Sequence, residues 1–408
     1  MQLITIANIL LATISGSNAC GIHVRLDSPS NLERRIPEAS LSTSKTVINN
    51  ARVWNGLRFQ KPRTVVIDGG IIGIDPRDAD VTIDAEGRYL IPGLMESHGH
   101  AYTVQALEAY SGYGVTTALN LNCPNYTICD MLKSQVGLTS LRHAGTPVIA
   151  PGSDHARANL IPDSMLIRSV DMVEDLVKWT ADNGSDFMKI VSEGNGPTQD
   201  MQDAVVEACN KRGLPSTTHA SWLLPYEQAV NSGATSIQHI AGDSPIPQDV
   251  IRKMKQQGQF STPTLTVHRY VADNPDIREI MQGTRETNQS FAIHRDNVSR
   301  FHKAGIPLLA GSDAVGVNDI FNLPHGLMLH RELENLIEAG LSPAEVLRAA
   351  TSVPARLHKF PDRGVIAPGK RADLVLLNSD PLANISNTQD IARVWIEGIE
   401  FANVTRKM

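Results

Sequence analysis

Short apolar runs alternate with amphipathic stretches through the middle of the chain. The apolar runs predict buried strands, whereas apolar residues recurring every three or four positions predict helices. The stretches "DMVEDLVKWTADNG" and "MQDAVVEACNKRG" have the helical pattern and end in Gly, which helix C-termini favour. The strands predicted in this part lie at residues 94–97, 116–121, 147–151, 187–192, 215–219, 236–239, 259–264 and 307–312.

The two ends of the chain have a different character. Runs such as "RTVVIDGGIIGI" near the N-terminus and "ADLVLLN" near the C-terminus are rich in Val, Ile and Leu and are punctuated by turn residues. We therefore predict an α/β protein with a (β/α)8 TIM barrel at residues 92–361 and a small β-sandwich domain assembled from residues 45–91 and 362–404. An open doubly wound sheet is the alternative, but no predicted strand precedes a Gly-rich dinucleotide loop.

Composition excludes several classes of partner. The 408 residues carry a net charge of −6 without a basic block, and only 5% are aromatic, which disfavours nucleic acid. The apolar stretch near the N-terminus is too short to span a bilayer, and residues 1–19 are predicted to be a signal peptide, although no Lys or Arg precedes the apolar run. We expect a secreted glycoprotein; the alternative is a cytoplasmic protein with a buried N-terminal segment. The composition leaves a homo-oligomer open.

Cysteine spacing gives a limited framework. Cys123 and Cys129 flank a predicted loop and could be joined in an oxidising compartment, whereas Cys209 lies in a helical pattern and suits a buried core position. No Cys-x-x-Cys pair suggests a thiolate zinc site.

Two histidines follow the first predicted strand, in "GLMESHGH". Because alternate residues of a strand point the same way, His98 and His100 are expected to converge on one point. Two neutral imidazoles can form half of a metal site, but the pair alone is also compatible with two unrelated polar residues. Further ligand-type residues occur at the ends of other predicted strands, where barrel enzymes keep their chemistry. These residues are Lys189, His219, His239 and Asp313. Together they favour a metal site.

The segments "IPGLMESHGH", "MKIVSEG", "THAS", "IQHI" and "AGSDA" resemble the successive motifs of the amidohydrolase superfamily. The likeness extends over about residues 45–400 and is strongest to the branch that contains imidazolonepropionase-like enzymes, Xaa-Pro dipeptidases and ochratoxin-hydrolysing amidases. The resemblance implies a barrel with a flanking β-sandwich, and a metal-dependent hydrolase of carbon–nitrogen bonds in small molecules, peptide or non-peptide.

The resemblance also implies roles for the strand-end residues. His98, His100 and Asp313 would bind one divalent ion, His219 and His239 a second, and a carbamate on Lys189 would bridge them. If Lys189 is not carboxylated, one ion is expected. Nitrogen and oxygen ligands without thiolate suit Zn²⁺, with Mn²⁺ or Co²⁺ as alternatives. Asp313 would act as general acid and base toward a metal-activated water.

Three further histidines are candidates for substrate binding. His155 and His268 follow predicted strands and could face the substrate, although His155 is also compatible with a plain loop position. His325, in "PHG", resembles a position of the family, and its alternative role is to anchor a loop. Glu96 stands where relatives carry an aspartate, and could orient a metal ligand. The alternatives to amide hydrolysis are a lactone or ester hydrolase, a mononuclear deaminase, and a non-catalytic metal-stabilised binding protein. "HASWLLP" and "HIAGDSP" lack the glutamate that a deaminase commonly uses as its proton shuttle.

Overall fold

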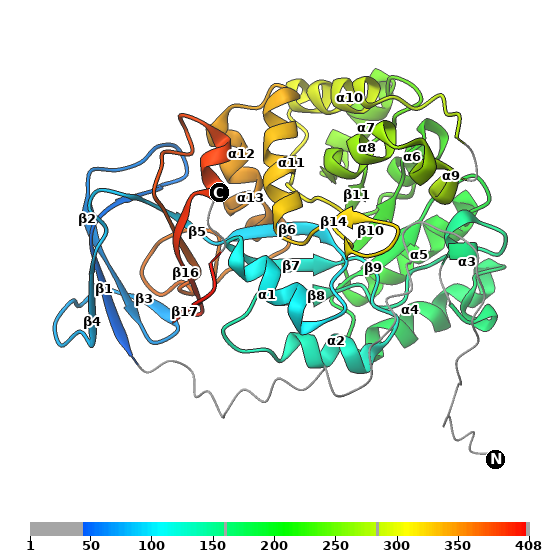
Figure 1. Ribbon diagram of the computed structural model, residues 1–408. Coiled ribbons are helices and arrows are strands. Elements are labelled where there is room, and N and C mark those ends of the chain that lie inside the picture. Colours follow the sequence, from blue (N-terminus) through cyan, green and yellow to red (C-terminus); the bar gives the residue numbers. More distant parts are fainter. Residues whose placement is uncertain (1–43, 159–160, 283–284, 405–408) are drawn as a thin grey trace, which may run out of the picture.

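The computed structural model describes residues 44–158, 161–282 and 285–404. The predicted signal peptide lies outside these residues. Figure 1 shows a β-rich lobe beside a larger lobe in which helices cover parallel strands. No helix in the described ranges is both long and apolar enough to cross a membrane.

Both ends of the chain contribute to one eight-stranded sheet in the β-rich lobe. Its main path runs through β17 (Ile399–Glu400), β16 (Ile391–Ile396), β15 (Leu374–Leu377), β5 (Tyr89–Pro92), β1 (Lys45–Val53), β2 (Arg63–Asp68) and β3 (Ile71–Gly73), with β4 (Val81–Asp84) paired to β1. The sheet encloses a core of its own, because Ile48 of β1, Ile67 of β2, Leu376 of β15 and Trp395 of β16 belong to one buried cluster.

The larger lobe contains two parallel sheets. One consists of β6 (Leu94–Gly99), β7 (Val115–Asn120) and β8 (Ser140–His143), and the other of β9 (Met188–Val191), β10 (Ser216–His219), β11 (Ser236–Gln238) and β12 (Phe260–Thr262). Every residue of these last four strands and of β6 and β7 is buried, as expected for strands covered on both faces.

Two predicted strands are present only as isolated bridges, which is a correction to the sequence analysis. Residues 147–151 contribute the bridge between Val148 and Ile190, and residues 307–312 contribute the bridge between Leu308 and Ser261. Proline lacks the backbone N–H that a ladder requires, and prolines begin both segments. The segment β8, which was not predicted, takes the place next to β7.

The second bridging segment also reaches β6. Ala314 pairs with Gly99, and Asp313 N–H donates to the His98 carbonyl across 2.7 Å. Residues 308–314 therefore join β12 to β6. On the other side of the sheets the ladder between β8 and the Val148 segment is interrupted, so the described strands form two linked sheets rather than one closed ladder.

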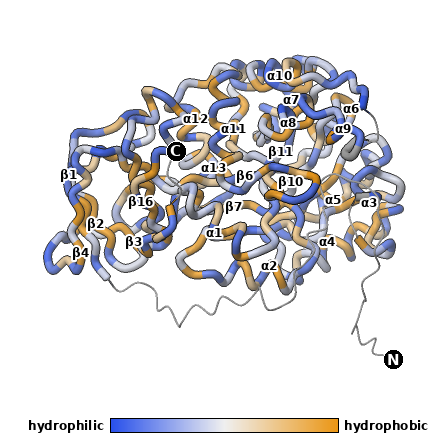
Figure 2. The backbone as a smooth tube through the Cα atoms, in the orientation of Figure 1, coloured by the Kyte–Doolittle hydropathy of each residue, from blue (hydrophilic) through white to orange (hydrophobic). Residues whose placement is uncertain are grey.

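The helices lie around the parallel strands (Figure 1). Their bounds are α1 Val104–Gly112, α2 Tyr126–Lys133, α3 Asp154–Ala158, α4 Val173–Asp182, α5 Gln199–Arg212, α6 Leu223–Ser232, α7 Gln248–Gln256, α8 Leu265–Asp273, α9 Pro275–Gln282, α10 Phe291–Ala304, α11 Leu327–Glu338, α12 Pro343–Ala349 and α13 Ser352–Leu357. In Figure 2 they carry both hydrophilic and hydrophobic stretches, as amphipathic helices do. Helix α5 ends at Gly213 in the left-handed conformation, which confirms the glycine predicted at the end of "MQDAVVEACNKRG", and α6 ends in the same way at Gly233. Helix α4 has Asn183 as its C-cap, and Gly184 follows with a positive φ of 90°.

A short hairpin follows Asp313. Its strands are β13 (Gly316–Val317) and β14 (Asn322–Leu323), and it leaves Val317 exposed.

Candidate metal centre

The structure places the predicted ligand residues at the carboxyl ends of several strands. His98 lies on β6 and His100 just beyond it, Lys189 lies on β9, His219 ends β10, and His239 directly follows β11. The exposed fraction of each of these side chains and of Asp313 is small, from 0% for His98 to 8% for His219. Six polar groups drawn from distant parts of the sequence are therefore buried in one region.

The environment of His98 tests whether this region fits a cation. His98 Nδ1 lies 2.9 Å from Gln238 Oε1, and an amide oxygen can only accept, so Nδ1 carries the proton. Burial lowers the pKa of His98 well below its usual value, which leaves the ring neutral and Nε2 without a proton. That bare nitrogen lies 3.3 Å from Asp313 Oδ1. Two acceptors face each other here, an arrangement that a cation between them would stabilise.

Asp313 brings the two histidines of the first motif together. Its Oδ1 lies 3.0 Å from His100 Nε2 as well as 3.3 Å from His98 Nε2. Burial opposes ionisation of Asp313, but its interactions with His98 and His100 outweigh this and hold its pKa below the usual range. The carboxylate is therefore charged and available as a ligand.

His219 and His239 form the other flank of the region. Their ring centroids lie 4.3 Å apart, and those of His98 and His239 lie 4.8 Å apart. Among the described residues, neither His219 Nδ1 nor His239 Nε2 has a hydrogen-bond partner. Burial lowers the pKa of both rings well below the usual value, so both offer lone pairs.

One potential ligand set combines two residues of the first flank, His98 and Asp313, with His239 of the other. Ligand atoms of His98, His239 and Asp313 all lie within 4.8 Å of one another. Lys189 is buried close to the same groups and contributes to the lowered pKa of His98, His219 and His239. A positive ammonium at this place opposes cation binding, so the charge of Lys189 decides how many ions the residues present can hold.

Two of these residues have a strained backbone. His239 has φ of 68° and Asp313 has φ of 60°, in the left-handed region that residues with a side chain seldom adopt. Such strain persists where surrounding structure enforces it, commonly at functional sites. Here the left-handed turns direct both side chains toward His98.

Glu96 holds two ligand-bearing segments together. Its carboxylate accepts hydrogen bonds from His98 N (3.1 Å), Ser312 N (2.8 Å) and Ser312 Oγ (2.6 Å). Burial nevertheless raises its pKa to about 8. Through these hydrogen bonds Glu96 orients the backbone beside His98 and Asp313.

The three histidines predicted to bind substrate have distinct surroundings. His155 donates from Nδ1 to Glu193 Oε2 across 2.9 Å, and its ring lies 4.5 Å from that of His219. His268 lies in the first turn of α8. Its ring centroid is 5.6 Å from that of His239, and its ring stacks on that of His294 with the centroids 3.8 Å apart. His325 donates from Nε2 to the His100 carbonyl across 3.0 Å, which fits its alternative role as an anchor.

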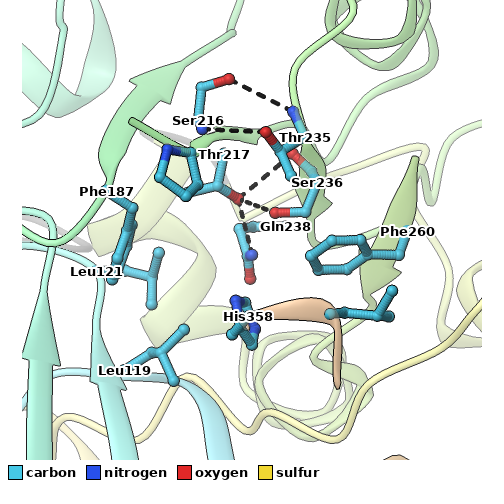
Figure 3. A pocket seen from close by; sticks show the side chains of 12 residues that line it. Leu119, Leu121, Phe187, Ser216, Thr217, Thr235, Ser236, Gln238, Phe260 and His358 are labelled. Atoms are coloured by element: carbon cyan, nitrogen blue, oxygen red, sulfur yellow. Dashed lines mark hydrogen bonds between the residues drawn. The ribbon is translucent and has the colours of Figure 1, made fainter. Parts of the chain in front are cut away.

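Gln238, which the sequence did not single out, is a further candidate residue of the site because it contacts His98 Nδ1. Its Nε2 donates to Thr217 Oγ1 across 2.8 Å, and Ser236 Oγ donates to the same hydroxyl across 2.8 Å (Figure 3). These contacts fix the amide so that Oε1 faces His98. The three residues also line a cavity of about 20 Å³, which suits a single water. The only signal in the sequence is the position of Gln238 directly before a predicted ligand.

Comparison with known proteins supports a metal-dependent site. Residues 89–399 match a family model described as "Amidohydrolase family". The adenine deaminase of Geobacillus kaustophilus is 22% identical over 90% of this chain, which spans 60% of that relative's length. A Xaa-Pro dipeptidase structure with bound methionine superposes with a TM-score of 0.78 at 22% identity, covering 88% of this chain and 99% of that one. The structure of A. niger ochratoxinase superposes with a TM-score of 0.72 at 17% identity, and the superposition covers 87% of this chain and 95% of the ochratoxinase chain. At these identities the structures show a shared fold.

Proposed function

Because the chain belongs to the amidohydrolase family, we propose that it is a metal-dependent hydrolase of an amide or cyclic amide bond in a small molecule. The observation that carries the proposal is the unprotonated His98 Nε2 facing the Asp313 carboxylate across 3.3 Å. The Xaa-Pro dipeptidase and ochratoxinase likenesses support the class of reaction. We also propose that the two parallel sheets and their bridging segments correspond to the (β/α)8 barrel of such enzymes.

The residues present divide into two ligand groups. His98, His100 and Asp313 would hold one divalent ion, His219 and His239 a second, and a carbamate on Lys189 would supply bridging oxygens. Imidazole and carboxylate donors without thiolate suit Zn²⁺. When bound, the ions supply an acidified water and positive charge opposite the scissile carbonyl.

Asp313 is the residue proposed to move the proton. Its carboxylate is ionised and buried, and it lies against the imidazoles of His98 and His100. It would accept a proton from the attacking water and deliver it to the leaving nitrogen, as one residue acting as base and then as acid. Its left-handed backbone holds the carboxylate in place. His155, oriented by Glu193, is proposed to contact the substrate on the His219 side.

Deamination is the second candidate. The curated relatives named adenine deaminase support it, and it too breaks a carbon–nitrogen bond. The chain covers 60% of the length of the first of these relatives, and the loops after β10 and β11 carry no glutamate in "HASWLLP" and "HIAGDSP". We therefore rank amide hydrolysis first.

Secretion is proposed on the predicted signal peptide and on one structural observation. Cys123 and Cys129 form a disulfide, which is typical of proteins from oxidising compartments.

The test combines metal content with turnover. Freshly purified protein would be assayed by elemental mass spectrometry, and its hydrolysis of aminoacyl-prolines, N-acyl amino acids and neutral aryl amides measured before chelation, after chelation and after addition of Zn²⁺. Ammonia release from adenine would be measured in parallel. We expect amide hydrolysis to be lost after chelation and to recover after addition of Zn²⁺. Active protein without a bound transition metal would overturn the proposal, and ammonia release alone would favour the deaminase.

A further inference from the structure

A pocket of about 340 Å³ opens beside the metal centre. It lies between the start of α1 and the β13–β14 hairpin, and its volume is within the range of small-molecule sites. Most of its lining is aromatic or aliphatic, from Tyr102, Ala106, Ala109, Tyr113, Val317 and Pro324, and the neutral polar side chains of Thr103 and Gln105 complete it.

His100 connects this pocket to the proposed reacting atoms. Its side chain lines the pocket, and its Nε2 lies 3.0 Å from Asp313 Oδ1. His325, which also lines the pocket, donates to the His100 carbonyl and so fixes that wall. A group bound in the pocket would therefore lie directly beside the ligand cluster.

The lining contains no Asp, Glu, Lys or Arg among the described residues. Its only ionisable groups apart from tyrosine are the two histidines, His100 and His325. A carboxylate or ammonium placed here would lose water, and no charged side chain of the lining would pair with it, which is unfavourable. Apolar and aromatic groups would be stabilised by the tyrosine rings and aliphatic side chains.

We propose that this pocket binds a neutral aryl or branched alkyl group of the substrate, so that the enzyme prefers amides uncharged at that group to amides carrying a carboxylate there. The inference rests on the proposed function and deepens it, because it separates neutral amides from substrates with a charged group at this position.

The test uses matched pairs of substrates. Hydrolysis of 4-isopropylacetanilide and 4-carboxyacetanilide by the Zn²⁺-loaded full chain would be compared through kcat/KM. We expect a preference of about tenfold or more for the neutral member, the order that an unpaired buried charge produces. Equal rates, or faster hydrolysis of the carboxylate, would overturn the proposal.

Two variants locate the preference in the pocket. Val317→Arg adds a cation at a lining residue that is 68% exposed, and Leu224→Arg adds the same charge at a residue that is 66% exposed on α6 and does not line the pocket. Because both positions are exposed, both variants are expected to fold. Val317→Arg should reduce the preference to about threefold or less by pairing with the carboxylate, and Leu224→Arg should leave it unchanged. The same shift in both variants would contradict the assignment.

A binding measurement separates the pocket from the reaction. The ketones 4-isopropylacetophenone and 4-acetylbenzoate have no carbon–nitrogen bond, and their dissociation constants would be measured by calorimetry. If the protein hydrolyses neither anilide, the proposed function fails for this class, whereas tighter binding of the neutral ketone that Val317→Arg weakens would still support the pocket. Absence of any difference between the ketones would refute it.

Discussion

Gln238 accepts a hydrogen bond from His98 Nδ1 across 2.9 Å and thereby fixes which nitrogen of His98 faces Asp313. The amide is itself fixed by Thr217, so the tautomer of His98 is set by residues of two neighbouring strands, β10 and β11. Partners of this kind orient metal ligands and increase their basicity. The orientation of His98 toward Asp313 therefore depends on residues outside the proposed ligand set.

Replacing Gln238 by Leu should weaken metal binding without unfolding the protein. The leucine removes the acceptor at Nδ1, so His98 can place a proton on Nε2 and lose its free lone pair. Loss of such a partner typically costs about 10- to 100-fold in metal affinity. The dissociation constant for Zn²⁺ would be measured by competition with a chelator.

Two matched variants complete that experiment. Gln238→Glu keeps an acceptor oxygen and should retain affinity. Gln259→Leu removes another buried amide, one that donates to the Ala234 carbonyl rather than to a proposed ligand. It should lower stability but leave Zn²⁺ affinity unchanged. Parent affinity in Gln238→Leu would contradict the proposed role.

Asp313→Asn should abolish most turnover. The amide has nearly the shape of the carboxylate but cannot accept the proton of the attacking water, and loss of a general base typically costs about 10²- to 10⁴-fold. Measured kcat would be divided by the bound metal per chain, so that a loss of ligand and a loss of base are distinguished. Asp319→Asn, at an exposed position, is the control. Activity per bound metal that matches the parent would remove Asp313 from the mechanism.

The capping box of α12 predicts a pH-dependent contribution to stability. Glu345 accepts from Ser342 N (2.8 Å) and Ser342 Oγ (2.6 Å) and lies 3.0 Å from His302 Nε2. These contacts lower its pKa to about 2 from an ordinary value of 4.5. A carboxylate with a depressed pKa stabilises the folded state above its unfolded pKa, and this contribution disappears as the pH falls from about 4.5 to 2.

Glu345→Gln should therefore lower the free energy of unfolding by about 1 kcal/mol at pH 7, a typical capping contribution reduced by partial exposure. The difference from the parent should shrink as the pH falls below 4.5, which urea unfolding at pH 7 and pH 3.5 would measure. Glu207→Gln, which removes an exposed pair with Lys211, should show little difference at either pH. A difference that grows on acidification would contradict the prediction.

The Cys123–Cys129 disulfide should stabilise the fold modestly. It closes a short loop of sequence separation 6, for which chain entropy predicts about 2 kcal/mol. The double variant Cys123→Ser/Cys129→Ser should unfold at correspondingly lower denaturant concentration. A reductant should shift the parent to the same midpoint and leave the double variant unaffected. If reductant shifts both proteins equally, the effect does not arise from this disulfide.

Much of the proposed centre could be predicted because strand periodicity is a local property. His98 and His100 are two residues apart, and both reach Asp313 Oδ1, as convergence of alternate side chains requires. Residues at the ends of successive parallel strands meet at one edge of the sheets, which brought His219 and His239 within ring contact. Geometry of this kind follows from spacing alone.

Other features of the proposed centre could not be predicted, because they depend on unusual backbone conformations and on contacts between residues far apart in the sequence. The left-handed turns at His239 and Asp313 oppose the local preference of both residues and arise from the surrounding structure. Glu96 binds the backbone of Ser312, 216 positions away, and no local pattern encodes that contact. Residues 147–151 resemble a strand in hydrophobicity, but the chain there forms a single bridge.

The pairing of β5 with β15 has a consequence for how the protein is made. Val375 and Ile91 are partners across this junction, although almost the whole larger lobe separates them in the sequence. On the ribosome, the N-terminal strands emerge first and must wait with one edge unpaired until the last segment is synthesised. A nascent chain stalled before residue 374 would thus expose a strand edge whose unpaired backbone groups can pair with another chain. Chaperones that shield such edges would be needed most until residues 374–377 have been synthesised.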